Sequence, residues 1–212
     1  MYNITVKNFS LPKADEKEIW RYANCKNADE ALKKLLQECL VESEKAIVGR
    51  ACYCKLSLAD FYALVDGAAQ SKGVQERLQG CQEVVIFAAS VGLGIDRLME
   101  KYAKLSPTKA LLLQAIGAER IERLCDEVCA HLQAEYGEIT ARFSAGYGDF
   151  PLSAQKAFFR LLDCPKKIGV SLTDALLMTP TKSVTAFVGI GKGKAATGCL
   201  ACDKQNCSMR KE

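Results

Sequence analysis

The sequence predicts an α+β fold in which a twisted antiparallel sheet is flanked by helices. Apolar residues recur with helical spacing in several segments, other segments carry strand patterns, and one apolar run shows no alternation. Helices and strands do not alternate as strictly as in a parallel doubly wound sheet. The 212 residues fit one large domain or two small ones. We expect one domain over residues 1–190, or two subdomains divided near 80–105, followed by a Gly/Lys linker and cysteine-rich tail over 191–212.

The composition is that of an ordinary globular protein and argues against two classes of partner. Hydrophobic residues make up 49% of the chain and charged residues 25%. The formal charge of +4 is spread along the sequence without a basic block, so we expect no nucleic-acid partner. Residues 1–9 do not resemble a signal peptide, and no apolar run approaches the roughly 18 residues that span a membrane. We therefore expect no membrane association and a cytoplasmic location.

The first quarter of the chain carries an edge-strand signal and then two helix signals. Residues 2–8 alternate and are rich in β-branched side chains, which predicts an edge strand. Residues 13–22 are expected to form a short helix. A clearer helix is expected to follow, with Asn27 or Asp29 as its N-cap and Gly49 as its end.

The central strand of the sheet is predicted in the middle of the chain. Residues 51–58 have a strand pattern, and the unbroken apolar run over 84–89 is typical of a strand buried on both faces. The Gly92-x-Gly94 turn that follows lacks the third glycine of a phosphate-binding loop. We interpret it as a tight turn from the strand into a helix that ends near residue 105.

The longest helix is predicted to begin at Ser106, as N-cap, and Pro107, as first helical residue, and to continue to about Tyr136. Residues 139–150 contain glycines and closely spaced polar residues, so we expect an ordered loop. A short helix is expected to begin at Ser153.

Pro165 and Gly169 are expected to close that helix. Residues 172–178 and 183–190 then alternate in polarity, and we expect them to pair as antiparallel strands around Pro180.

Most of the 11 cysteines are expected to be core residues. Cytosolic thiols stay reduced, and a buried cysteine behaves as a small hydrophobe. Cys39, Cys125 and Cys129 fall on apolar helical stripes, and Cys52 and Cys54 are expected to share one face of their strand.

Arg142, Gly146 and Tyr147 form the first constellation that suggests chemistry. An arginine guanidinium matches a carboxylate through its planar fork. Glycine lets the backbone approach a ligand closely, and a tyrosine ring can cover an adenine or a sulfonium cation. The alternative is a surface loop in which Arg142 forms a salt bridge and the glycines form turns.

Arg142-Phe-Ser-Ala-Gly-Tyr147 resembles the Arg-x-x-x-Gly-Tyr motif of the activation domain of cobalamin-dependent methionine synthase. A second stretch, residues 172–185, is similar to a mostly scaffolding stretch of the same family, and the two motifs occur in the family's order. The resemblance covers about residues 110–190. It departs from the family in lacking an N-terminal Asp-Trp-Thr-Pro element and in having Gly189–Gly198 where the family has ring-bearing residues.

The resemblance implies an activation domain-like fold and a binding site for S-adenosylmethionine. In the family, the motif's arginine grips the ligand's carboxylate, the loop contacts the rest, and an acidic residue on the preceding helix also contacts the ligand. Glu119 is assigned as that acidic residue, and Glu122 is the competing assignment. The alternative role for Glu119 is an ion pair with Arg120 or Arg123 on a solvated helix face. The site residues implied in this way are Arg142, Ser144, Gly146, Tyr147 and Glu119.

The tail Cys199-Leu-Ala-Cys202-Asp-Lys-Gln-Asn-Cys207 resembles half of a metal site. Zinc usually takes four protein ligands, and three thiolates with an outside ligand suit an iron–sulfur cluster. A redox pair of Cys199 and Cys202 and a flexible tail without chemistry are the alternatives.

The resemblance implies a role in reactivating a corrinoid methyltransferase of the methionine synthase type. A methyl group from S-adenosylmethionine and one electron from a flavodoxin- or ferredoxin-type donor restore an inactivated cobalamin. The chain is expected to be the reactivation component rather than a complete enzyme, and to act in trans on a separately encoded corrinoid-binding protein or methionine synthase modules. The rivals are a metal- or cluster-bearing accessory protein and a non-catalytic partner that caps a corrinoid domain.

Overall fold

The computed structural model describes residues 2–192 and confirms the α+β fold with an antiparallel sheet. The main sheet has four strands in the order β1-β2-β3-β6, and every neighbouring pair is antiparallel. A separate hairpin contains β4 and β5. The strands are β1 (Thr5–Phe9), β2 (Gly49–Ser57), β3 (Glu83–Ser90), β4 (Ser171–Leu172), β5 (Met178–Thr179) and β6 (Ser183–Ile190).

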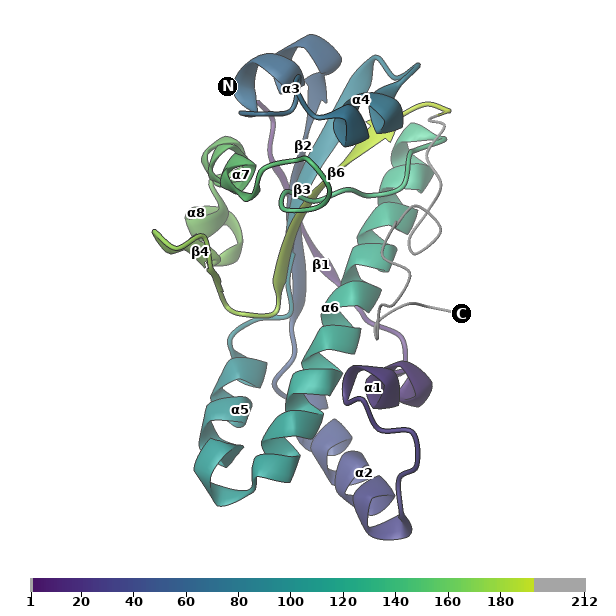
Figure 1. Cartoon of the computed structure of the whole chain (residues 1–212), viewed down its shortest axis with the longest axis vertical. Coiled ribbons are helices and arrows are strands. Elements are labelled where there is room, and N and C mark those ends of the chain that lie inside the picture. Colours follow the sequence, from purple (N-terminus) through teal and green to yellow (C-terminus); the bar gives the residue numbers. More distant parts are fainter. Residues whose placement is uncertain (1, 193–212) are drawn as a thin grey trace.

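Helices cover both faces of the sheet (Figure 1). The long helix α6 crosses one face, and α1, α2 and α5 pack against it. The opposite face is covered by α3, α7 and α8. The helices are α1 (Glu16–Tyr22), α2 (Glu30–Glu44), α3 (Leu58–Leu64), α4 (Lys72–Leu78), α5 (Gly94–Leu105), α6 (Pro107–Tyr136), α7 (Gln155–Leu162) and α8 (Cys164–Ile168), with a 3₁₀ turn η1 (Leu152–Ala154) before α7.

The strand β3 divides the hydrophobic core into two clusters. Val84, Ile86 and Ala88 point into the cluster beneath α7 and α8, whereas Val85 and Phe87 point into the cluster beneath α6. All five are buried, as the unbroken apolar run predicted. From Val84 to Ser90, every side chain of this strand is therefore buried, whichever face it lies on.

The cysteine predictions agree with this core. Cys39 and Cys125 are buried in the α6 cluster, and Cys129 packs against it half-buried. Cys52 and Cys54 are both buried in the α7–α8 cluster, which confirms that they share one face of β2. All five are free thiols.

The boundaries of α2 differ from the prediction at one end. Asp29 is the N-cap, and its carboxylate accepts a hydrogen bond of 2.7 Å from the Leu32 N–H. The helix ends at Glu44 rather than at Gly49. Gly49 is instead the first residue of β2 and pairs with Phe9; a Cβ at this position would lie 2.9 Å from the Phe9 carbonyl oxygen. This glycine is required by the close approach of β1.

The two glycines after β3 form the expected turn. Gly92 has a φ of 83°, in the region that favours glycine. Gly94 begins α5, and a Cβ on it would lie 2.1 Å from the Ala46 carbonyl oxygen. The turn is therefore specified by backbone packing against the end of α2, and its glycines are explained without a phosphate.

The predicted pairing of residues 172–178 with 183–190 is wrong. The segment 183–190 is β6 and pairs with β3, while the other segment contributes only the ends of the β4–β5 hairpin. Ala186, Phe187 and Val188 are all fully buried, so this strand has apolar residues on both faces and fits the main sheet better than an isolated hairpin.

One helix boundary near Pro165 was also misplaced. Pro165 lies inside α8 instead of closing the preceding helix, which ends because Asp163 adopts a left-handed conformation with φ of 48°. Gly169 ends α8, also in a left-handed conformation. Ser106 precedes Pro107 as predicted, but its side chain makes no capping hydrogen bond. The start of α6 therefore depends on the proline and on packing.

Candidate functional site

The loop over residues 139–150 is fixed to the free edge of β6 by backbone hydrogen bonds. Phe143 and Phe187 exchange two of them, at 3.0 and 2.9 Å. Thr140 donates its N–H to the Gly189 carbonyl oxygen at 2.9 Å, and its hydroxyl accepts from the Gly189 N–H at 2.9 Å. The loop therefore continues the sheet, and its successive side chains point to opposite faces.

Arg142 points from this loop onto the outer side of α6. Its Nη1 lies 2.5 Å from an oxygen of Asp126, and its Nη2 lies 2.7 Å from an oxygen of Glu122. The two acidic residues are four positions apart, so they lie on one face of the helix. Their side chains are 49% and 45% exposed, against 28% for Arg142. The salt bridge that the alternative interpretation gave to Arg142 is therefore present, and its carboxylates are open to solvent.

Two cysteine thiols lie beside this cluster of Glu122, Asp126 and Arg142. Burial raises the pKa of the Cys125 and Cys129 thiols, so both are uncharged near neutral pH. The ion-pair cluster thus contains two negative charges and one positive charge.

Tyr22, the last residue of α1, lies near Glu122 of the same cluster, with the Arg21 guanidinium 4.3 Å from the centre of its ring. Burial, followed by the negative charge of Glu122, raises the pKa of the Tyr22 hydroxyl. The phenol is therefore neutral near neutral pH, and it brings an aromatic ring from the N-terminal helix towards the acidic face of α6.

The segment Ser144 to Phe150 closes a tight turn beside the cluster. Gly146 donates its N–H to the Phe150 carbonyl oxygen at 2.9 Å and has a φ of 91°. Ser144 is half-buried, whereas Tyr147 exposes 66% of its surface. A β-carbon at position 146 would lie 3.0 Å from Leu152, so glycine satisfies both the backbone angle and the space.

Asp149 attaches the far end of this turn to α4. Its carboxylate accepts hydrogen bonds from the Ser71 hydroxyl at 2.6 Å, the Lys72 N–H at 2.6 Å and the Gly73 N–H at 3.2 Å. The Ser71 hydrogen bond, followed by that from Lys72, lowers the pKa of Asp149. The turn is thus held at both ends, by β6 and by α4.

The other face of the loop carries an aromatic cluster. Phe143 packs edge-on against Phe187 and lies parallel to Phe150. The Arg77 guanidinium lies 4.0 Å from the centre of the Phe143 ring. The Nε of Arg77 is buried and hydrogen-bonds to no residue within 2–192. Arg77 therefore contributes packing here rather than an ion pair.

Glu119 is not part of the Arg142 cluster. It is 3% exposed and accepts two hydrogen bonds from Arg120, at 2.5 and 2.7 Å, and one from the Asp15 N–H at 3.2 Å. Arg120 also donates to the Pro12 carbonyl oxygen at 2.6 Å. In the structure this pair anchors the N-terminal segment to α6, and ligand contact by Glu119 stays a prediction.

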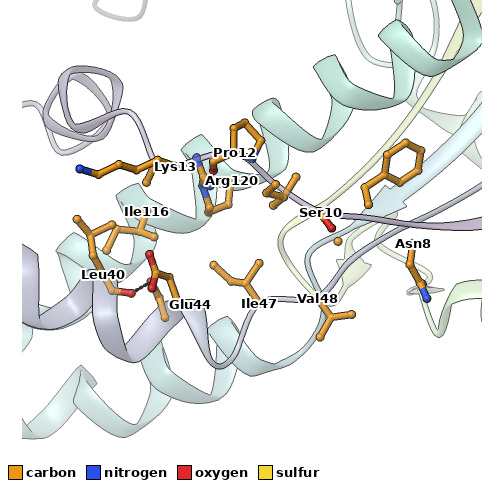
Figure 2. A pocket seen from close by; sticks show the side chains of 15 residues that line it. Asn8, Ser10, Pro12, Lys13, Leu40, Glu44, Ile47, Val48, Ile116 and Arg120 are labelled. Carbon is orange, nitrogen blue, oxygen red and sulfur yellow. Dashed lines mark hydrogen bonds between the residues drawn. The ribbon is translucent and has the colours of Figure 1, made fainter. Parts of the chain in front are cut away.

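A cavity of about 520 Å³ lies on the other side of Arg120 (Figure 2). Figure 2 shows the segment from Ser10 to Lys13 along one wall and Ile47 and Val48 along the other. The loop over 139–150 lines none of it. The cavity is lined by Asn8, Phe9, Ser10, Leu11, Pro12, Lys13, Ala14, Leu40, Ser43, Glu44, Ile47, Val48, Gly49, Ile116 and Arg120.

The predicted metal site stays a prediction. Cys199, Cys202 and Cys207 lie outside the described residues. Within residues 2–192, no group of three or more His, Cys, Asp or Glu side chains is arranged to hold a metal ion. No helix in this part of the chain is long and apolar enough to cross a membrane.

Two functional candidates were missed or placed second by sequence reasoning. Asp126 was not considered, and Glu122 was only the alternative to Glu119. Their spacing of four residues on a helix that precedes an arginine loop was the available signal. Which helical face meets the loop depends on the pairing of residue 143 with β6, and the sequence alone does not specify that pairing.

Comparison with known proteins gives a family and a fold. The sequence matches the family described as vitamin B12 dependent methionine synthase, activation domain, over residues 13–205. The fold is similar to the crystal structure of the MetH reactivation domain bound to AdoHcy, with a TM-score of 0.65 and 13% sequence identity. That alignment covers 93% of this chain and 81% of the MetH chain. The search of curated proteins finds no match. Because the family match includes most of the sequence, the chain belongs to the activation-domain family of vitamin B12-dependent methionine synthase.

Proposed function

We propose that this chain binds S-adenosylmethionine at the Arg142 loop and supports reductive reactivation of a cobalamin-dependent methyltransferase of the methionine synthase type. One observation carries the proposal: in a member of this family, the motif's guanidinium is held beside two half-exposed carboxylates, Glu122 and Asp126. AdoHcy in the structurally similar MetH domain supports an adenosyl ligand.

Ligand binding is proposed to occur by exchange of ion-pair partners. The ligand's carboxylate takes the fork of Arg142, since a planar guanidinium binds a carboxylate through two parallel hydrogen bonds. The displaced Glu122 and Asp126 carboxylates then face the ligand's positive groups. No charge is left unpaired, so the exchange avoids the main cost of separating a partly buried ion pair.

The rest of the turn positions the adenosyl part of the ligand. Tyr147 offers an exposed ring, and Gly146 lets the backbone approach closely. Ser144 is proposed to make a polar contact with the ligand. Because the turn is tied to β6 and to α4, its geometry is set before the ligand arrives, which is the contribution expected of a positioning protein.

The cobalamin is proposed to be carried by a separately encoded corrinoid-binding protein or by methionine synthase modules. It supplies the reducible, methyl-accepting centre when bound. The electron is proposed to come from a flavodoxin- or ferredoxin-type donor. The residues of this chain bind and orient the methyl donor.

Calorimetric titration of S-adenosylmethionine into wild type and Arg142→Ala tests ligand binding. We expect the substitution to weaken binding by about tenfold to a hundredfold, the cost of one charged hydrogen-bonding group. Arg50→Ala is the matched control, because the Arg50 side chain is exposed on β2 and hydrogen-bonds only Asn8 among the described residues. Absence of binding to anaerobically purified wild type would contradict the proposal, as would equal binding by Arg142→Ala.

Affinity capture with purified corrinoid proteins tests action in trans. We expect wild type to retain a corrinoid-binding protein and to restore its methyltransferase activity when S-adenosylmethionine and a reduced donor are supplied. Arg142→Ala should bind the partner but fail to restore activity. Full restoration by Arg142→Ala would instead indicate a capping partner that does not use the ligand.

A further inference from the structure

The ion-pair cluster of Glu122, Asp126 and Arg142 carries one more negative charge than positive charge. Among residues 2–192, neither acidic side chain makes an ion pair with any cation other than Arg142. The neighbouring thiols and the Tyr22 phenol are neutral, as described above. A further cation, Arg21 beside the Tyr22 ring, is paired with Glu18 at 2.7 Å, so this pair adds no net charge. The nearby acidic residue Glu119 is compensated by Arg120. Two half-exposed carboxylates on one face of α6 therefore share a single cation.

We propose that this excess charge makes the site selective for the methyl donor over its demethylated product, with Asp126 and Glu122 as the specificity-determining residues. The inference rests on the proposed function, since it assumes that the adenosyl ligand binds at Arg142.

The methyl donor and its demethylated product differ in net charge. S-adenosylmethionine has a carboxylate, an ammonium and a sulfonium, so its net charge is positive. Loss of the methyl group converts the sulfonium to a neutral thioether and leaves a zwitterion. In the donor complex, the ligand carboxylate pairs with Arg142, and the two protein carboxylates match the two ligand cations. In the product complex, one protein carboxylate has no cation to face.

The expected discrimination is modest, because both carboxylates are about half exposed. Screening by water reduces a single charge contact at this exposure to the lower end of its range. We expect the donor to bind about five- to tenfold more tightly than the product. Such a bias favours release of the product after methyl transfer and its replacement by a fresh donor.

The test is to titrate wild type, Asp126→Asn and Glu127→Gln with three ligands in low salt. The ligands are S-adenosylmethionine, S-adenosylhomocysteine and an analogue in which a protonated amine replaces the sulfonium. Glu127→Gln is the matched control: it removes the same charge from the next position of α6, and Glu127 makes no ion pair within the described residues.

We expect wild type and Glu127→Gln to bind the two cationic ligands about five- to tenfold better than the neutral product. Asp126→Asn should reduce that ratio to within about twofold, and added salt should reduce the wild-type ratio. Equal affinities of wild type for donor and product would overturn the inference while leaving the proposed function intact. An unchanged ratio of donor to product affinity in both Asp126→Asn and Glu122→Gln would also overturn the inference. Failure of all three ligands to bind wild type would instead count against the proposed function itself.

Discussion

Arg142 and Arg77 lie on opposite faces of the loop over residues 139–150 and make different kinds of interaction. On the α6 face, Arg142 is paired with two carboxylates that remain open to solvent. On the other face, the Arg77 guanidinium lies on the Phe143 ring and forms no ion pair with any residue within 2–192. The first arrangement can exchange partners with a ligand, whereas the second holds the loop by packing. The comparison predicts that substitutions on the two faces affect different properties.

Phe143→Ala should have the largest effect on stability. The ring contacts Phe150 and Phe187 and supports Arg77, and large-to-small changes of this kind cost about 3 kcal/mol in the free energy of unfolding. Urea denaturation of both proteins measures the difference. Tyr147→Ala in the same loop is the control, because its ring is 66% exposed and its loss should cost less than about 1 kcal/mol. Similar losses for the two variants would show that the aromatic face does not hold the loop.

Arg142→Ala should show the reverse pattern. Its ion pairs with Glu122 and Asp126 are partly screened by water, so we expect the free energy of unfolding to change by less than about 1 kcal/mol. Binding of S-adenosylmethionine should fall much further, as proposed above. Denaturation and calorimetry on one preparation give both quantities. A stability loss as large as that of Phe143→Ala would mean that Arg142 has a structural role.

Gly146→Ala tests the turn between the two faces. The residue has a φ of 91°, and an added Cβ would lie 3.0 Å from Leu152, so the substitution should cost about 1–2 kcal/mol in the free energy of unfolding. Gly137→Ala is a useful control, because its φ of 83° is also positive but nothing lies within 4 Å of the added atom. The difference between the variants then isolates the crowding by Leu152. If both variants lose the same stability, the backbone angle alone requires glycine at position 146.

The two faces also differ in how well their residues could be predicted from the sequence. The motif Arg-x-x-x-Gly-Tyr identified Arg142, Gly146 and Tyr147 because these residue types have specific chemistry in any setting. Central strand β3 and helix α6 were predictable because their apolar patterns are long and continuous. Asp126 was missed because its importance depends on a tertiary contact with a loop sixteen residues away.

Other features were unpredictable for the same reason. The short helices α3 and α4 carry weak periodic signals, so the segment before β3 received no assignment. Residues 183–190 have an alternating pattern that suits a hairpin as well as a place beside β3. Burial on both faces decides between them, and burial depends on helices from distant parts of the chain.

Asp149→Asn should produce the smallest effect, and one that depends on pH. In the folded protein, the hydrogen bond from Ser71 and that from the Lys72 N–H lower the pKa of Asp149 below its ordinary value of 3.8. A lowered pKa means that the unfolded chain binds the proton more readily. The stabilisation by the Asp149 carboxylate is therefore fully present above that ordinary value and is lost as the pH falls through the lower, folded-state pKa.

Thermal unfolding of wild type and Asp149→Asn between about pH 6 and pH 2 measures this dependence. Wild type should melt at the higher temperature near pH 6, and the difference should shrink as the pH falls below 3.8. The exposed Asp174, on the β4–β5 hairpin, provides the control, because Asp174→Asn should match wild type. A difference that stays constant at acid pH would show that Asp149 fixes the loop by shape rather than by charge. In that case, acidification would leave the turn attached to α4.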